Sequence, residues 1–186
     1  MLSACESTVP ADTTASHTIS YTADILGKIE TGADVSETEP FTITLNLPSK
    51  WTTGELTTEK EGYPPYTVLF DENGENSGSI QFCTYVPDKE FSSNENYHQY
   101  VFNQLMLGSF VNWGVDYTPV KEGNDFCNAV CTIMTDKHDG SDIQYEQGIL
   151  AYNDTLGVYT NICFNTEIPD EIHKTIAESI VFTECN

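Results

Sequence analysis

Residues 41–48 read FTITLNLP, and this stretch decides how the rest of the chain is interpreted. Its apolar residues are Phe41, Ile43, Leu45 and Leu47. Each is followed by a polar residue or by the closing proline, and such alternation is typical of a β-strand that buries one face. Pro48 ends the pattern because it has no amide hydrogen for a sheet. The stretch predicts a half-buried strand, with Trp51 in the loop that follows.

Further strands are predicted along the whole chain. Short apolar or alternating runs that are bounded by Gly, Pro, Asn and Asp are typical of strands joined by tight turns. Such runs occupy residues 18–26, 66–70, 79–86, 113–120, 125–135, 143–152, 156–165 and 179–182. The turn-like segments 71–74, 139–142 and 153–155 lie between them.

Two segments have a helical period instead. Residues 92–109 begin with Ser92 and Glu95 in capping-box spacing, and Tyr97, Val101 and Leu105 then recur every four residues. A second helix is predicted after Pro169, which suits the first turn of a helix. Its apolar stripe consists of Ile168, Ile172, Ile176 and Ile180.

Helices separated by runs of strands favour an α+β domain. Residues 126–134 carry apolar side chains at both even and odd positions, which is typical of a strand that is covered on both faces. We therefore expect an antiparallel sheet of about six or seven strands with helices on both faces, an α/β/α sandwich.

The N-terminal residues Leu2-Ser3-Ala4-Cys5 resemble a bacterial lipobox, at which a signal peptide is removed and the cysteine is acylated. The following residues are small, polar or acidic, as in a flexible tether. We therefore expect a lipobox remnant and acidic tether at 1–17, a possible first strand and connector at 18–40, and one domain at 41–186. Lipid on Cys5 would hold the protein on the extracytoplasmic face of a bacterial membrane.

Charge narrows the classes of partner. The 186 residues include 29 acidic and 7 basic residues, for a formal net charge of −22. This balance argues against binding to nucleic acid or directly to an anionic membrane. We expect a monomer whose partner is an unknown protein or cell-surface ligand, and whose membrane contact is through lipid alone.

The cysteines give little support for a metal or redox site. Besides Cys5 they are Cys83, Cys127, Cys131, Cys163 and Cys185, an odd number. In a strand, Cys127 and Cys131 would share a face but lie ~13 Å apart, too far to share a metal. No Cys-x-x-Cys pair occurs. Buried thiols with one disulfide at most are the expected arrangement, with the pairing left open.

Catalytic signatures are also missing. The sequence has no Gly-x-Ser-x-Gly, His-Glu-x-x-His, Gly-x-Gly-x-x-Gly or P-loop pattern. A pair such as Cys83 with His98 is the remaining nucleophilic possibility. The acidic turns 71–76 and 136–142 lack the calcium-loop pattern and are more typical of solvated turns. We expect no catalytic residue, no metal and no cofactor.

Aromatic residues near the first strand form the candidate ligand contacts. Tyr63 and Tyr66 flank a Pro-Pro pair and lie close to Trp51 in sequence. These three rings could contact a ligand or glycan, although packing at the edge of the core is the commoner role of such residues.

The segment 41–51, FTITLNLPSKW, resembles the opening of Mog1/PsbP-like domains. The long central helix, the strand meander and the closing segment 178–182 extend this likeness over about residues 41–183. The resemblance implies an α/β/α sandwich that acts by binding proteins or assisting complexes, as in many bacterial lipoproteins. The chain departs from the family by an extra residue pair before Pro48 and by its long N-terminal stretch. No functional residue carries over.

The leading functional hypothesis is a non-catalytic, lipid-anchored, extracytoplasmic binding module. The alternatives are a glycan- or wall-binding domain that uses the three aromatics, an enzyme built on Cys83 or Cys163, and a calcium-dependent adhesin. The first of these alternatives requires that the rings share one exposed patch. The second requires a pocket in which one of the thiols meets a histidine or carboxylate.

Overall fold

The computed structural model describes residues 14–27, 38–58, 65–88, 96–107, 112–135, 144–165 and 167–185. The strands are β1 Thr14–Tyr21, β2 Phe41–Pro48, β3 Thr52–Thr57, β4 Tyr66–Phe70, β5 Asn76–Thr84, β6 Asn112–Glu122, β7 Phe126–Thr135, β8 Gln144–Asn153, β9 Val158–Phe164 and β10 Val181–Glu184. The helices are α1 Ala23–Leu26, α2 Tyr97–Leu107 and α3 Asp170–Ser179.

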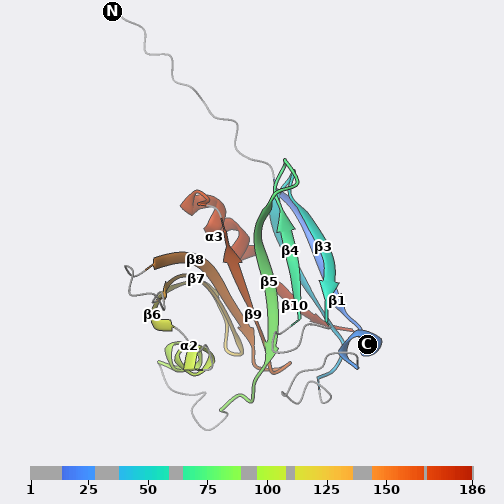
Figure 1. Ribbon diagram of the computed structural model, residues 1–186. Coiled ribbons are helices and arrows are strands. Elements are labelled where there is room, and N and C mark those ends of the chain that lie inside the picture. Colours follow the sequence, from blue (N-terminus) through green and yellow to red (C-terminus); the bar gives the residue numbers. More distant parts are fainter. Residues whose placement is uncertain are drawn as a thin grey trace, which may run out of the picture.

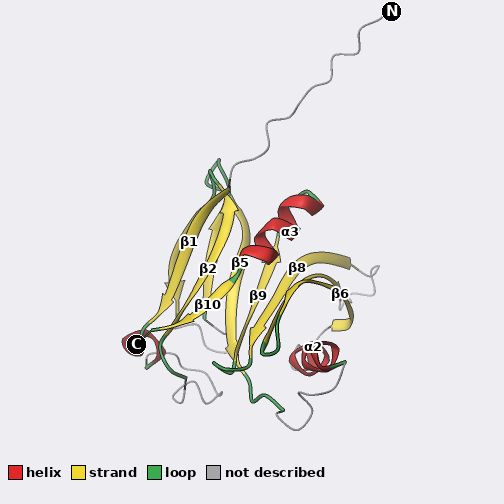
Figure 2. Cartoon of the chain, turned by 180° about the vertical axis from the view of Figure 1, so that it is seen from behind, coloured by secondary structure: helices red, strands yellow, loops and turns green. Residues whose placement is uncertain are grey.

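The strands form two antiparallel sheets (Figure 1). The larger sheet has seven strands in the order β3-β4-β5-β9-β8-β7-β6, and the smaller has three in the order β1-β2-β10. A mostly antiparallel protein with few helices agrees with the expected α+β class. The expectation of a single sheet is wrong, because β2 pairs with β1 and β10 instead of joining the meander. Figure 2 shows β1, β2 and β10 side by side, with α3 near them.

Strand β2 lies at the centre of the smaller sheet, and its alternating pattern is confirmed. Phe41, Ile43, Leu45 and Leu47 are fully buried, whereas the residues between them are partly exposed. Phe41 stacks on Tyr21 of β1, with 4.8 Å between the ring centroids, and meets Phe82 of β5 edge-on. The two sheets therefore share one apolar core, which also includes Ile176 and Ala177 of α3.

Neighbouring residues of β8 belong to two different core clusters. Ile149 and Ala151 belong to the cluster that contains the smaller sheet and α3. Leu150 and Tyr152 belong to a second cluster with α2. Because successive side chains of a strand point to opposite sides, β8 is covered on both sides, as its run of buried residues indicates.

The N-terminal boundaries differ from those expected. Strand β1 begins at Thr14, so residues 14–17, which were assigned to the tether, are paired with β2. Ile19 and Tyr21 lie in the same core as Phe41, so the folded unit does not begin at residue 41. The strand expected over 18–26 ends at Tyr21 and is followed by the short helix α1.

A polar side chain holds α3 against the larger sheet. Asn128 of β7 is buried, and its amide donates hydrogen bonds to the carbonyl oxygens of Ala177 (2.9 Å) and Ile180 (3.0 Å). These carbonyls lie at the C-terminal end of α3, where the backbone supplies the Ala177 oxygen with only a long hydrogen bond of 3.4 Å from the Ile180 N–H. The contact fixes α3 and, through it, the β9–α3 connection that forms part of the site below.

Candidate functional site

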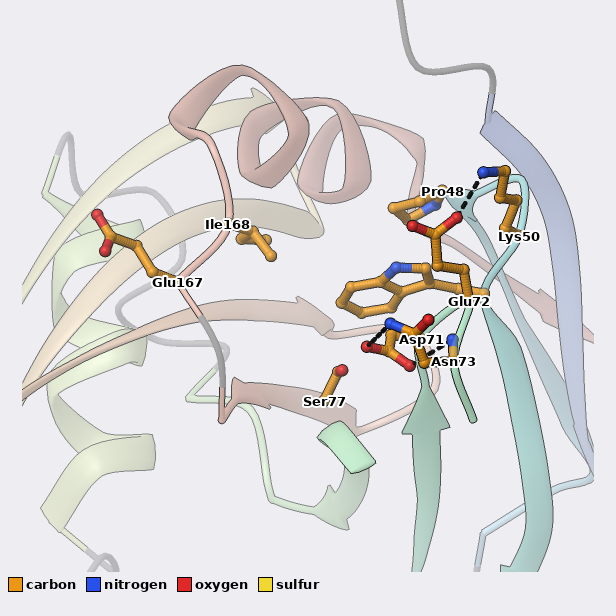
Figure 3. Close-up of a pocket in the computed structure, with 9 residues that line it drawn as sticks. Pro48, Lys50, Asp71, Glu72, Asn73, Ser77, Glu167 and Ile168 are labelled. Atoms are coloured by element: carbon orange, nitrogen blue, oxygen red, sulfur yellow. Dashed lines mark hydrogen bonds and ion pairs between the residues drawn. The ribbon is translucent and has the colours of Figure 1, made fainter. Parts of the chain in front are cut away.

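A pocket of about 290 Å³ lies where three connections of the chain meet (Figure 3). They are the β2–β3, β4–β5 and β9–α3 connections. The pocket is lined by Pro48, Lys50, Trp51, Asp71, Glu72, Asn73, Ser77, Glu167 and Ile168. Its volume is close to the lower limit for small-molecule sites, which suits a small ligand or one end of a larger ligand.

Apolar side chains form part of the pocket wall. Pro48 and Ile168 are buried, and Trp51 is half-buried. The indole packs on Phe164 with 6.4 Å between ring centroids, and the Trp51 amide donates to the Pro48 carbonyl at 2.8 Å. The ring is thus held in place by the core and the turn, while part of it lies in the pocket.

Asp71 contributes a carboxylate that accepts hydrogen bonds from the backbone of its own turn. Its Oδ1 accepts the backbone N–H of Asn73 at 2.8 Å and that of Glu75 at 2.9 Å. These hydrogen bonds, first the one from Glu75, lower the pKa of Asp71, so the group is charged at neutral pH. Because the oxygen is occupied by amide donors, this turn is organised without a cation.

The pocket lining has more acidic than basic side chains. Glu72 forms an exposed ion pair with Lys50. Glu167 is exposed and precedes the buried Ile168. The lining residues carry three carboxylates and one ammonium group, but Figure 3 shows the Glu167 carboxylate pointing away, so two carboxylates and one ammonium group lie at the pocket.

Ser77 supplies the most deeply buried polar group of the lining. The residue is 1% exposed, and Figure 3 shows its hydroxyl pointing into the pocket. The hydroxyl donates one long hydrogen bond of 3.4 Å to the Glu75 carbonyl. Its lone pairs can still accept a hydrogen bond from a ligand.

Of the predicted contact residues, the structure brings only Trp51 to this pocket. Tyr66 is half-buried in β4, and Tyr63 and Cys5 lie outside the described residues. The register pairs Thr52 with Phe70 and Thr57 with Tyr66, so Trp51 and Tyr66 lie near opposite ends of the β3–β4 pair. Because β4 rises ~3.3 Å per residue, the two rings do not form one patch.

Most of the other lining residues gave no signal of a site in the sequence. In the sequence, Asp71, Glu72 and Asn73 are more typical of a solvated turn than of a calcium loop, and Ile168 belongs to the apolar stripe of the last helix. Their approach to Trp51 depends on how the three connections are arranged in space. The one available sequence signal was the Pro48–Trp51 spacing after a buried strand.

A second polar group, which we call the tyrosine cluster, lies between α2 and the larger sheet. It consists of Tyr85, Tyr97, His98, Tyr152 and Asp154. Asp154 accepts hydrogen bonds from the hydroxyls of Tyr97, at 2.7 Å, and of Tyr85. His98 Nδ1 bonds the Tyr152 hydroxyl, and its Nε2 lies 3.9 Å from the Glu122 carboxylate.

The tyrosines of this cluster are poor acids. Burial is the main cause that raises the pKa of Tyr85, Tyr97 and Tyr152, and the nearby Asp154 raises it further. All three hydroxyls stay protonated at neutral pH. Their hydroxyls are therefore hydrogen-bond partners of Asp154 and His98, and these contacts attach α2 to the larger sheet.

Cys83, Cys127, Cys131 and Cys185 are free thiols, and the Cys163 thiol donates to the Asn161 side-chain oxygen at 3.7 Å. Burial raises the pKa of Cys127 and Cys131 to about 12, and it also raises the pKa of Cys83. Cys83 lies opposite Tyr159, whereas His98 bonds Tyr152. The structure therefore does not bring the proposed Cys83–His98 pair together, and neither Cys83 nor Cys163 lines the pocket.

Over the described ranges, no group of three or more His, Cys, Asp or Glu side chains is arranged to hold a metal ion. The acidic turn 136–142 lies outside those ranges. None of the helices in the described part of the chain is both long and apolar enough to cross a membrane. Comparison with models of known protein families and with curated protein sequences finds no match for this chain.

Proposed function

We propose that the protein is a non-catalytic binding module and that the pocket beside Trp51 is its ligand site. The observation that carries this proposal is the composition of the pocket. One wall is apolar and aromatic, another carries charged oxygens, and the floor carries a buried hydroxyl. Six of the nine lining residues are polar or charged, so the pocket suits a polar ligand that also has an apolar part for Pro48, Trp51 and Ile168.

The chemistry of the lining supports binding more than catalysis. The Asp71 carboxylate is held by its turn, Glu72 is paired with Lys50, and no thiol lies among the lining residues. An activated nucleophile needs an adjacent base; among the described residues of this lining there is no histidine or cysteine, and the carboxylates of Asp71 and Glu72 are already engaged by the turn and by Lys50. Carboxylates, an amide and a hydroxyl can instead position the donors of a bound molecule.

A glycan site is the second candidate, and Trp51 is the observation that favours it. An aromatic ring beside hydrogen-bonding side chains can stack on the apolar face of a sugar. The separation of Tyr66 from Trp51 limits such a site to one ring and to one or two sugar units.

Saturation-transfer NMR on the full chain tests the binding function. We expect that molecules from a panel of small neutral, cationic and anionic compounds bind with Kd below about 10 mM. The variant Glu167→Lys adds a long cationic side chain at the pocket rim and should abolish or redirect this binding. The control Glu184→Lys makes the same change on exposed β10, outside the pocket. No saturation transfer to any compound would overturn the proposal.

The location of the module is part of the proposal. The lipobox-like Leu2-Ser3-Ala4-Cys5 supports acylation of Cys5 and an extracytoplasmic site at a bacterial membrane. Mass spectrometry of the product of the full gene, expressed in a bacterial host, should show a diacylglycerol or triacyl mass on Cys5. An unmodified Cys5 in that host would overturn the anchoring, while the pocket proposal would stand.

The Mog1/PsbP-like domain is the fold hypothesis that accompanies this function. Two observations support an α/β/α arrangement: α2 contacts one core cluster and α3 the other. The separate β1-β2-β10 sheet argues for a divergent member. Superposition of an experimental structure on family members tests this hypothesis, and a different connectivity of the strands would refute it.

A further inference from the structure

We propose that the pocket selects an organic cation, a ligand with an alkylammonium group, over neutral sugars and over anions. This inference rests on the proposed binding function and names the class of ligand. It depends on three features of the lining: its charge, its apolar wall and its buried hydroxyl.

The charge of the lining favours a positively charged ligand. Two carboxylates, those of Asp71 and Glu72, lie at the pocket with one ammonium group, and that ammonium is engaged with Glu72. Asp71 is held in its charged form by backbone N–H groups, so its charge persists in mildly acidic solution. The net charge of −22 adds a field of the same sign, which attracts cations and repels anions.

The apolar wall favours an organic cation over a metal ion. A calcium ion needs six to eight oxygen ligands. Here the Asp71 oxygens accept hydrogen bonds from its own turn, and Glu72 pairs with Lys50. An alkyl chain, in contrast, would cover Pro48, Ile168 and the indole, and an aromatic face attracts a cation that lies over it.

The buried hydroxyl gives the ammonium group a hydrogen-bond partner. Ser77 is almost fully buried, points into the pocket and makes only one long hydrogen bond as donor. An ammonium group has three donors and no acceptor, so it matches a hydroxyl lone pair next to carboxylate oxygens. A carboxylate ligand would place its charge beside Asp71 and Glu72.

Fluorescence titration measures this selectivity. The chain has two tryptophans, so Trp113→Phe leaves Trp51 as the single indole. The probes are n-butylammonium chloride, methyl glucoside and sodium butyrate at constant ionic strength. We expect n-butylammonium to bind at least about tenfold more tightly than methyl glucoside, and butyrate not to bind. The indole cross-peaks of the wild-type protein in an NMR titration give the same ranking without the background substitution.

Two substitutions that should change the affinity for n-butylammonium in opposite directions test the role of charge. Glu72→Gln removes a carboxylate and should weaken n-butylammonium binding about three- to fivefold. Lys50→Met removes the competing ammonium and should strengthen it by a similar factor. The control Glu184→Gln, on exposed β10, should leave the affinity unchanged within error.

The outcomes separate the inference from the proposed function. Tighter binding of methyl glucoside, or affinities that ignore both Glu72→Gln and Lys50→Met, would overturn the cation assignment and leave a binding pocket. No response of the Trp51 signals to any of the three probes would also overturn the cation assignment, whereas the binding function itself fails only if the whole panel shows no saturation transfer.

Discussion

The Trp51 pocket and the tyrosine cluster use similar polar side chains, but these side chains face different surroundings. In the tyrosine cluster, Asp154 accepts two tyrosine hydroxyls and His98 bonds a third. In the pocket, the Ser77 hydroxyl and the carboxylates of Asp71 and Glu72 lie around an open volume of about 290 Å³. Polar groups that satisfy one another stabilise the fold, whereas polar groups that face a cavity are available to a ligand.

Alkaline pH should produce the largest difference between the two regions. The pKa values of Tyr85, Tyr97 and Tyr152 are raised in the folded protein, so their stabilising contribution is complete below pH 10 and is lost as the pH rises above it. Each tyrosine would contribute up to about 1.4 kcal/mol per pH unit in that range. Urea unfolding at pH 8–11 should show this decline, to which Cys127 and Cys131 add above about pH 8.5.

The pocket provides the control for this experiment. Glu72→Gln should leave the alkaline decline unchanged, while Tyr85→Phe should reduce it. A free energy of unfolding that stays constant up to pH 11 would contradict the assigned burial of the tyrosine hydroxyls.

Asp154→Ala should give the second-largest effect. It removes the acceptor of two hydroxyls, one of them on Tyr97, which is 4% exposed. Leaving buried donors without a partner should cost about 2–3 kcal/mol in the free energy of unfolding, measured in urea. Affinity at the pocket should not change. If a folded Asp154→Ala protein lost ligand binding, this would contradict the conclusion that the tyrosine cluster stabilises the fold and only the pocket binds ligand.

His98→Leu should have a smaller effect. The substitution leaves the hydroxyl of fully buried Tyr152 without this partner and should lower the free energy of unfolding by about 1–2 kcal/mol. His98→Gln can restore a hydrogen bond and should recover part of the loss. Equal stabilities of the two variants would show that the hydrogen bond contributes nothing measurable.

Lys50→Met should have the smallest effect on stability. The side chains of the Lys50–Glu72 pair are 71% and 52% exposed, and exposed pairs contribute less than about 1 kcal/mol. We expect a change in Tm of no more than about 2 °C together with the altered ligand affinity. A large loss of stability would show that Lys50, like Asp154, mainly stabilises the fold.

Much of the strand pattern could be predicted from the sequence because burial repeats every second residue. The pattern of β2 was correct residue by residue, and β4, β7, β8 and β9 lie close to their predicted ranges. Strand β3 was missed because TTGELT has one large apolar residue and a pairing irregularity between Thr53 and Leu56. As an edge strand it has little to bury.

The separation into two sheets could not be predicted, because local pattern does not specify which strands pair. Strand β10 lies more than 130 residues after β2 in the chain, yet it pairs with β2. The candidate site has the same limitation. Trp51 could be predicted as a candidate contact residue in the loop after a strand, but Ser77 and Glu167 join it only through the meeting of three distant connections.

Chemical-shift mapping with n-butylammonium on the wild-type chain tests the central claim most directly. We predict that the shifts concentrate at residues 48–51, 71–77 and 167–168, and that Tyr97, Tyr152 and Asp154 of the tyrosine cluster do not respond. Shifts centred on the tyrosine cluster, or no saturable shifts at Trp51 and Ser77, would contradict the assignment of the pocket as the binding site.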